Sequence, residues 1–124
     1  MAESFAVQLS QILSEYSEEV VDATNSSIDK VSKEAAKMLR NNSPKKTGSY
    51  ARGWGTKAER GHGGIKTVTV HNRTDYQLTH LLEKGHVIRN KKGTYGRAPA
   101  HPHIKPVEEW ANNELPAEIE RKLQ

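Results

Sequence analysis

The sequence YQLTHLLEKGHVIRNKKGTYGRAPAHPHIKP, residues 76–106, contains the turns that decide how the chain folds. Its first apolar residues recur at steps of three and four, a spacing that predicts a short helix over residues 75–84. Gly85 follows the last apolar turn, which is the usual position of a glycine that ends a helix. Val87 and Ile88 then predict a short extended segment. The return toward a last helix is held extended by three prolines, Pro99, Pro102 and Pro106.

The middle of this stretch is strongly basic. Residues 89–97, RNKKGTYGR, contain two glycines and no carboxylate, and their four cations are Arg89, Lys91, Lys92 and Arg97. Such a composition is typical of a solvated loop or the tip of a hairpin. We predict that these four side chains face either DNA or an acidic surface of a neighbouring subunit.

The N-terminal part of the chain predicts a long amphipathic helix over residues 1–42. Apolar residues from Phe5 to Leu39 follow helical spacing, and neither Pro nor Gly interrupts them before Pro44. A polar run, DATNSS at residues 22–27, allows an alternative in which two helices meet there, because its short side chains compete with helical hydrogen bonding. One helix over most of the span would be on the order of 50 Å long, more than the width of a small domain. We therefore expect part of its apolar stripe, including Leu9 and Ile12, to contact another subunit.

Two stretches after this helix alternate like strands. Residues 49–57 and 65–72 predict an antiparallel hairpin, with a flexible tip at ERGHGG, residues 59–64. Tyr50 and Trp54 are expected to form the core face of the first strand. Alternatively, with Arg52 and Lys57, they would form a surface for stacking and phosphate contacts. Segments near residues 87–88 and 100–104 are expected to add strands to the same sheet.

The last segment predicts a helix with one apolar face. Pro106 fits its first turn, where the missing N–H costs nothing, and Val107 and Trp110 lie on the apolar face. Pro116 is expected to kink or restart this helix. The predicted fold is therefore α+β: a long N-terminal helix, a small, mainly antiparallel sheet, a short middle helix and a C-terminal helix. We expect one domain over residues 1–124, with the α+β body at 43–124.

Composition limits the possible classes of protein. The 124 residues are 34% hydrophobic with a mean hydropathy of −0.83, which is low for a self-contained globule. The absence of cysteine rules out disulfide frameworks and thiolate metal sites. The pattern predicts neither a membrane span nor a signal peptide, and so a soluble protein made in the cytoplasm. The net charge of +4 is concentrated in the middle of the chain, whereas the two ends are acidic.

The candidate chemistry is sparse. His101 and His103, two apart in an extended segment, would point to one face, and Glu83 could supply a carboxylate to a zinc ion there. No recognised ligand spacing accompanies them, so a packing role is the stronger interpretation. The glycines of GHGG lack the rest of a phosphate-binding motif, and no serine is marked as a nucleophile. We therefore predict no enzyme activity, no cofactor and no metal.

Several short motifs occur in an order that resembles a known family. The residues are Thr47, Gly48, Tyr76, Glu83, Gly85, Pro99, Pro102 and Pro106. This order is similar to that of the neck, or tail-completion, proteins that join the head and tail of long-tailed bacteriophages. The resemblance implies a structural virion protein, assembled in the host cytoplasm as an oligomeric ring of six or twelve copies. It also implies contacts with other connector and tail proteins and with DNA that passes through the lumen.

Under this resemblance the motif residues shape the subunit and its ring contacts, and none is catalytic. A different class, a free-standing basic module that binds nucleic acid, remains the alternative. Such a module would be monomeric or dimeric and would bind duplex DNA with a steep salt dependence. A metallohydrolase is a third class, which metal analysis would test.

Overall fold

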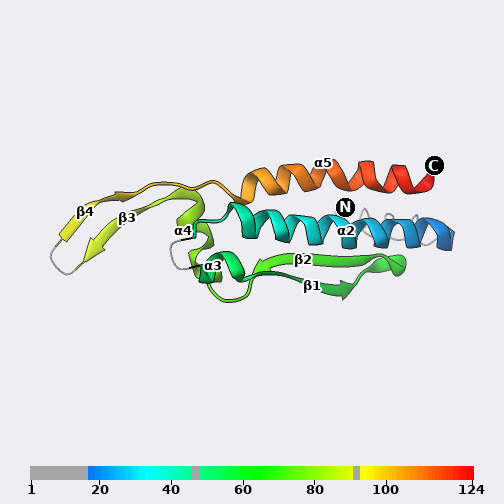
Figure 1. Cartoon of the computed structure of the whole chain (residues 1–124). Coiled ribbons are helices and arrows are strands. Elements are labelled where there is room, and N and C mark those ends of the chain that lie inside the picture. The colour runs from blue at the N-terminus through cyan, green and yellow to red at the C-terminus, as the bar shows by residue number, and fades with distance from the viewer. Residues whose placement is uncertain (1–16, 46–47, 91–92) are drawn as a thin grey trace, which may run out of the picture.

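The computed structural model describes residues 17–45, 48–90 and 93–124, and it has the predicted α+β architecture (Figure 1). The elements follow one another as α2 (Glu18–Asn42), α3 (Ser49–Arg52), β1 (Trp54–Arg60), η1 (His62–Gly64), β2 (Lys66–Asn72), η2 (Tyr76–Leu78), α4 (Thr79–Lys84), β3 (His86–Asn90), β4 (Gly93–Ala98) and α5 (Ile104–Leu123). The short middle helix and the C-terminal helix lie where the sequence predicts them.

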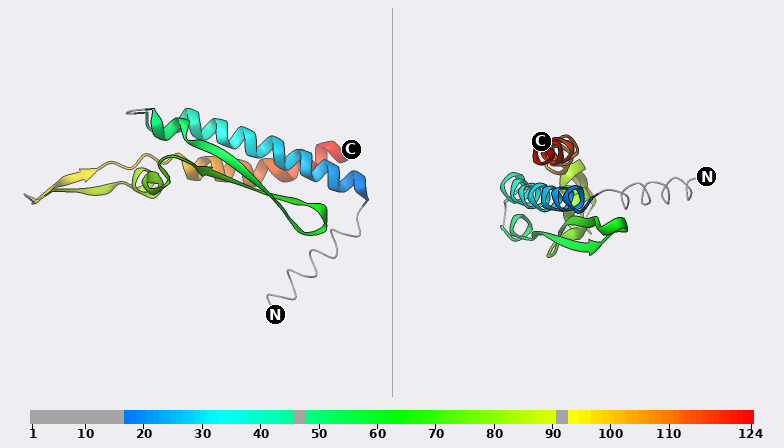
Figure 2. Two further views of the ribbon diagram at one scale, coloured as in Figure 1. Left: turned by 90° about the horizontal axis from the view of Figure 1, so that it is seen from below. Right: turned by 90° about the vertical axis from the view of Figure 1, so that its right-hand side faces the viewer.

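Helix α2 is the middle layer of the body. Helix α5 runs antiparallel along one side of it, and the β1–β2 hairpin lies along the other side (Figures 1 and 2). The β3–β4 hairpin extends beyond the end of this body, and we call it the arm (Figure 1). The molecule is therefore a three-layered body with an elongated projection.

The long helix begins at Glu18. Ser17 is its N-cap, with extended backbone at ψ 159° and a side chain that accepts a hydrogen bond from the Val20 N–H. An unbroken helix through Ser17 is therefore wrong, and residues 1–16, with Leu9 and Ile12, lie outside the described residues. At 1.5 Å per residue, the 25 residues of α2 span about 38 Å.

The polar run at residues 22–27 does not divide the helix. The hydroxyls of Thr24 and Ser27 each donate to the carbonyl four residues earlier, at 2.8 Å, so they do not compete with helical hydrogen bonding. Asn25 uses its amide to hold the end of the hairpin: it donates to the Gly64 carbonyl at 2.9 Å and accepts from the Lys66 N–H at 3.0 Å. The tip expected to be flexible is thus bonded to α2.

The predicted hairpin is present, but its first strand starts later than expected. Residues Ser49–Arg52 form the short helix α3, and β1 runs from Trp54 to Arg60 and pairs antiparallel with β2. Tyr50 and Trp54 are four residues apart, a spacing that places two side chains on one face of either a helix or a strand. The apparent alternation therefore could not separate the two structures, and the assignment of residues 49–53 to a strand is wrong.

The arm is a sheet of its own. Among the described residues, β3 pairs only with β4, antiparallel, and neither strand joins the β1–β2 sheet. The expectation that residues 87–88 would extend the first sheet is therefore wrong. The return at residues 100–103 is not a strand either, and it leads directly into α5.

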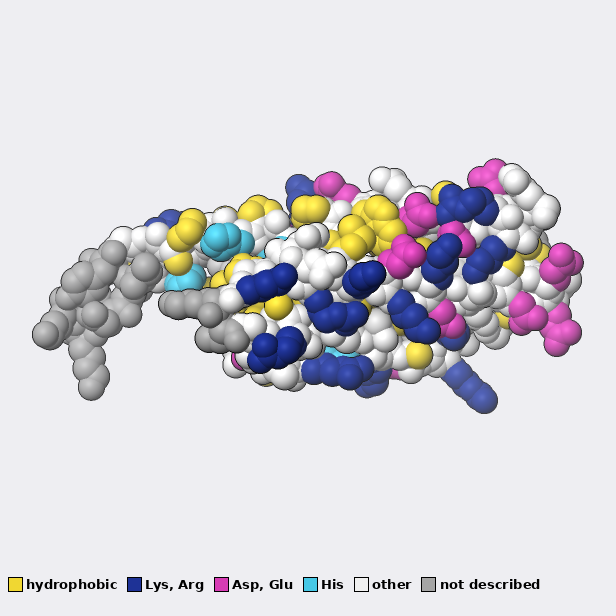
Figure 3. All heavy atoms as spheres, viewed as in Figure 1, with side chains coloured by type: hydrophobic (Ala, Val, Ile, Leu, Met, Phe, Trp, Pro, Cys, Tyr) yellow, Lys and Arg dark blue, Asp and Glu magenta, His cyan; other side chains and the backbone are white. Residues whose placement is uncertain are grey.

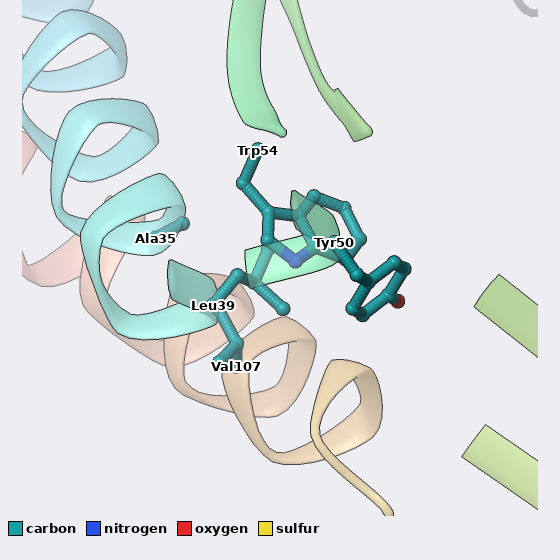
Figure 4. Packing of buried hydrophobic residues seen from close by; sticks show 5 residues of the cluster. All are labelled: Ala35, Leu39, Tyr50, Trp54 and Val107. Atoms are coloured by element: carbon teal, nitrogen blue, oxygen red, sulfur yellow. The ribbon is translucent and has the colours of Figure 1, made fainter. Parts of the chain in front are cut away.

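The core lies where the three layers meet the arm. It contains Ala35 and Leu39 of α2, Tyr50 of α3, Trp54 of β1 and Val107 of α5 (Figure 4). The rings of Tyr50 and Trp54 meet edge to face, with centroids 5.7 Å apart. The Trp54 indole donates to the Ser43 hydroxyl at 2.8 Å, so its polar atom is satisfied inside the core. The interpretation of Tyr50 and Trp54 as core residues is confirmed.

The last helix runs unbroken from Ile104 to Leu123. Pro106 lies in its first turn as predicted, whereas Pro116 lies inside the helix without restarting it. Proline there removes one helical hydrogen bond, and contacts with α2 offset this loss. One of these contacts joins Lys30 of α2 to the buried Glu118 of α5 at 3.1 Å.

Candidate assembly interface

The base of the arm is fixed to helix α4. The Arg97 guanidinium donates to the Lys84 carbonyl at 3.3 Å, and the His101 N–H donates to the Leu82 carbonyl at 2.8 Å. These bonds use carbonyl groups at the end of α4 that have no partner within the helix. Between them, Gly85 adopts φ 78°, and a Cβ there would lie 2.7 Å from the Ala98 carbonyl oxygen. Only glycine fits this close approach of the two chain segments.

Glu83 joins the arm base to the body. Its carboxylate accepts hydrogen bonds from three successive backbone N–H groups at the start of α5, those of His103, Ile104 and Lys105, at 2.8, 2.8 and 3.0 Å. A carboxylate at this position satisfies free helical donors and complements the helix dipole. Partial burial alone would raise the pKa of Glu83, but the three backbone hydrogen bonds outweigh this effect and lower it.

A buried hydrogen-bond chain continues from Glu83 into the core. His103 is 2% exposed, with Nδ1 at 3.0 Å from the Glu83 carboxylate and 2.6 Å from the His101 carbonyl. Its Nε2 lies 2.7 Å from the Tyr50 hydroxyl. Both neighbours of Nδ1 are acceptors, so we assign the proton to Nδ1, and Nε2 accepts from Tyr50. Burial, together with the Glu83 carboxylate, raises the pKa of Tyr50 to about 12, so the phenol keeps its proton.

This geometry corrects the interpretation of His101 and His103 as two groups on one face. His103 lies inside the core, whereas the side chain of His101 is exposed. His103 is the N-cap residue of α5, with φ −132° and ψ −23°, so the extended backbone expected at residues 101–103 ends here. Among the described residues, no three His, Cys, Asp or Glu side chains form a group that could hold a metal ion.

Of the four basic residues predicted to face a partner, the structure describes Arg89 and Arg97. The backbone of Arg89 lies in β3, and Arg97 lies in β4 with an exposed side chain. Lys91 and Lys92 follow β3 directly, and they lie outside the described residues, as does Thr47. The structure therefore places Arg89 and Arg97 on the arm, one in each strand of its hairpin.

Exposed apolar side chains gather near the arm base. Three of the four large exposed apolar residues in the described part of the chain belong to η2 and β3: Tyr76 at 72%, Leu78 at 36% and Val87 at 39%. The fourth is Leu123 at the far end of α5, exposed by 42%. The family motif residue Tyr76 therefore points to solvent, unlike Glu83 and Gly85, which shape the backbone. Pro99, Pro102 and Pro106 are also exposed.

Charge is distributed unevenly over the body. Lys and Arg side chains form a band across the face seen in Figure 3, and carboxylates are most numerous at the end where α2 begins and α5 ends. The sequence alone predicts a basic middle, which starts at Lys37, and acidic ends, and the last turns of α2 belong to this basic stretch. Exposed cations of α2 include Lys33, Lys37 and Arg40.

Sequence reasoning missed the contact between Tyr50 and His103. These residues are 53 positions apart, and no local pattern indicates that they meet. The order of Glu83, Gly85 and the prolines in the sequence could have indicated the arm base, because each residue restricts the backbone there. No helix in the described part of the chain is long and apolar enough to span a membrane.

Comparison with known proteins gives the family. No curated protein and no solved structure matches the chain significantly. A family model described as "Bacteriophage HK97-gp10, putative tail-component" matches residues 8–85, more than half of the chain. The match includes α2, the β1–β2 hairpin and α4 and stops at Gly85, so the arm and α5 lie outside it. The chain therefore belongs to the HK97-gp10-like family of bacteriophage tail components, which are structural parts of the virion.

Proposed function

We propose that this chain is a ring-forming subunit of the head–tail connector of a long-tailed bacteriophage, acting in the neck or in tail completion. Its partners would be further copies of itself, other connector and tail proteins, and DNA that passes non-specifically through the lumen. Assembly would take place in the cytoplasm of the bacterial host. The family match supports a structural phage protein, and the arm supports an assembling subunit.

The arm is the observation that carries this proposal. It is a two-stranded sheet that extends beyond the body, and a two-stranded hairpin alone is marginally stable in water. Within the described residues each of its strands has one edge without a partner strand, and such edges readily pair with another chain. The exposed side chains of Tyr76, Leu78 and Val87 add an apolar surface at its base. In a closed ring, the arm of one subunit would lie against the body of the next.

The first test is the mass of the purified protein. Sizing chromatography with light scattering should give a multiple of the 13.9 kDa subunit, and negative-stain electron microscopy should give closed rings. The Tyr76→Ser substitution should lower the fraction in rings at least tenfold without changing the melting temperature, because this side chain is mostly exposed. Leu123→Ser is the matched control at the other end of the body, and it should assemble normally. A protein that stays monomeric at high concentration, alone and with its neck partners, would contradict the proposal.

A second test concerns the segment that precedes α2. Leu9→Asp or Ile12→Asp should weaken assembly while leaving the cooperative melt of the subunit, because the sequence pattern predicts that these side chains contact a partner. Circular dichroism during heating and light scattering would be measured on the same samples. If either variant loses its cooperative melt, the apolar stripe is part of the core of the subunit.

A further inference from the structure

Beside the arm base, three cations converge on one hollow. It has a volume of about 260 Å³, and its lining residues are Arg40, Lys45, Gly48, Ala51 and Arg52. No carboxylate of a described residue lines it. The three cationic side chains are exposed to solvent, while Ala51 is buried beneath them. The hollow therefore presents a concentrated positive charge that nothing in the described part of the chain neutralises.

Two of the cations are held by specific backbone features. The Arg40 guanidinium donates from Nη1 to the Trp54 carbonyl at 3.0 Å, which ties its position to the core, and its other N–H groups bond no described residue. The Arg52 guanidinium lies against Gly48, where a Cβ would collide with it. Gly48 also has φ 83°, a conformation that favours glycine. Gly48 therefore lets the Arg52 guanidinium lie against the backbone at the hollow.

The positive charge continues along α2. Lys33, Lys37 and Arg40 are separated by steps of four and three, so they share one face of the helix over about 10 Å. All three are exposed, and no carboxylate of the described residues pairs with them. A row of charges that ends in a hollow fits an extended polyanion better than a single small anion.

We infer that this hollow and the adjoining face of α2 bind the phosphodiester backbone of duplex DNA. Guanidinium groups match phosphate oxygens with two parallel hydrogen bonds, and the side chains of Arg40 and Arg52 are both exposed. An acidic protein surface is less suitable, because protein interfaces bury apolar side chains at their centre, and none of the described residues that line the hollow has a large exposed apolar side chain. The inference rests on the proposed function only for the choice of DNA as the polyanion.

The test is the salt dependence of DNA binding by the full chain. Fluorescence anisotropy of a labelled duplex of random sequence would be measured across a range of salt concentrations. Removing two phosphate contacts with the double variant Lys45→Gln and Arg52→Gln should lower the slope of log affinity against log salt by about 1.8. The matched control, Lys84→Gln with Lys105→Gln, removes two exposed cations outside the hollow and should leave the slope unchanged.

A second double variant, Lys45→Arg with Arg52→Lys, keeps both charges and should keep the original slope. All variants should melt within about 1 °C of the natural chain, since exposed charges contribute little to stability. Equal slopes for the Gln variant and its control would overturn the inference. The inference would also be overturned if the Lys45→Gln and Arg52→Gln variant bound DNA like the natural chain but no longer assembled into rings, because the hollow would then contact protein. If the protein forms rings that do not bind DNA, the inference about the hollow is wrong but the connector role stands. If the protein binds DNA through the hollow but forms no rings, the connector role is wrong but the inference stands.

Discussion

Replacement of His103 by alanine should lower the free energy of unfolding by about 3 to 5 kcal/mol, the largest effect we expect from a single substitution. The ring is buried, packs edge to face on Tyr50 and Trp54, and links the Tyr50 hydroxyl to the arm base. Its removal would leave both a cavity and a phenol without its partner. Urea unfolding followed by circular dichroism would measure the loss.

His101→Ala is the matched control for this substitution. The two histidines are separated only by Pro102, but the His101 side chain is exposed, and this residue bonds to Leu82 and His103 only through its backbone N–H and carbonyl. We expect its stability to change by less than about 0.5 kcal/mol. The His103→Phe variant, which retains an aromatic ring but not the hydrogen bonds, should fall between the two. Equal stabilities for the two alanine variants would mean that the buried network does not hold the fold together.

The Glu83→Gln substitution should cost about 2 kcal/mol near pH 7, because hydrogen bonds to a charged acceptor contribute more than neutral ones. The folded pKa of Glu83 lies below its ordinary value of 4.5. The stabilisation by the carboxylate is therefore fully present above pH 4.5, and it is lost as the pH falls through the lower folded pKa. The difference between the natural chain and the variant should shrink toward zero over this acidic range.

Urea titrations at neutral and acidic pH would test both statements. Glu109→Gln is a suitable control, because Glu109 is exposed on α5 and has no partner among the described residues. It should change stability by less than about 0.5 kcal/mol at either pH. A loss in Glu83→Gln that persists at acidic pH would show that the effect comes from packing rather than from the carboxylate charge. Loss of ring assembly in Glu83→Gln at neutral pH, without a change in stability, would place Glu83 in the interface instead.

Local signals in the sequence predict much of the fold. The helical spacing before Gly85, the β-branched strand at residues 66–72 and Pro106 at the start of α5 each depend on neighbouring residues alone. The helix over 18–42 is also predictable, but its start at Ser17 is hidden, because apolar spacing continues on both sides of the cap. The short helix α3 is ambiguous for a geometric reason, since Tyr50 and Trp54 share a face in either structure.

The candidate sites were harder to predict, because they depend on contacts between distant segments. Glu83 was recognised as a motif residue, but nothing nearby indicates that it would bind the start of α5, twenty residues later. Likewise, the hollow forms only when the end of α2 lies beside α3. The basic segment at residues 89–97 is easy to recognise in the sequence, because it is a run of cations without a carboxylate. Its contact with DNA or with an acidic neighbour remains a prediction.

The antiparallel pairing of α2 with α5 has a consequence for the time at which the protein can fold. Leu39 packs against Val107, which lies about 70 residues later in the chain. The ribosome needs roughly 3 to 14 seconds to add these residues at about 5 to 20 residues per second. During this interval the face of α2 that packs against α5 lacks that partner. The newly made protein therefore passes through a period in which chaperones, or premature contacts with other copies, compete for the surface that α5 later covers.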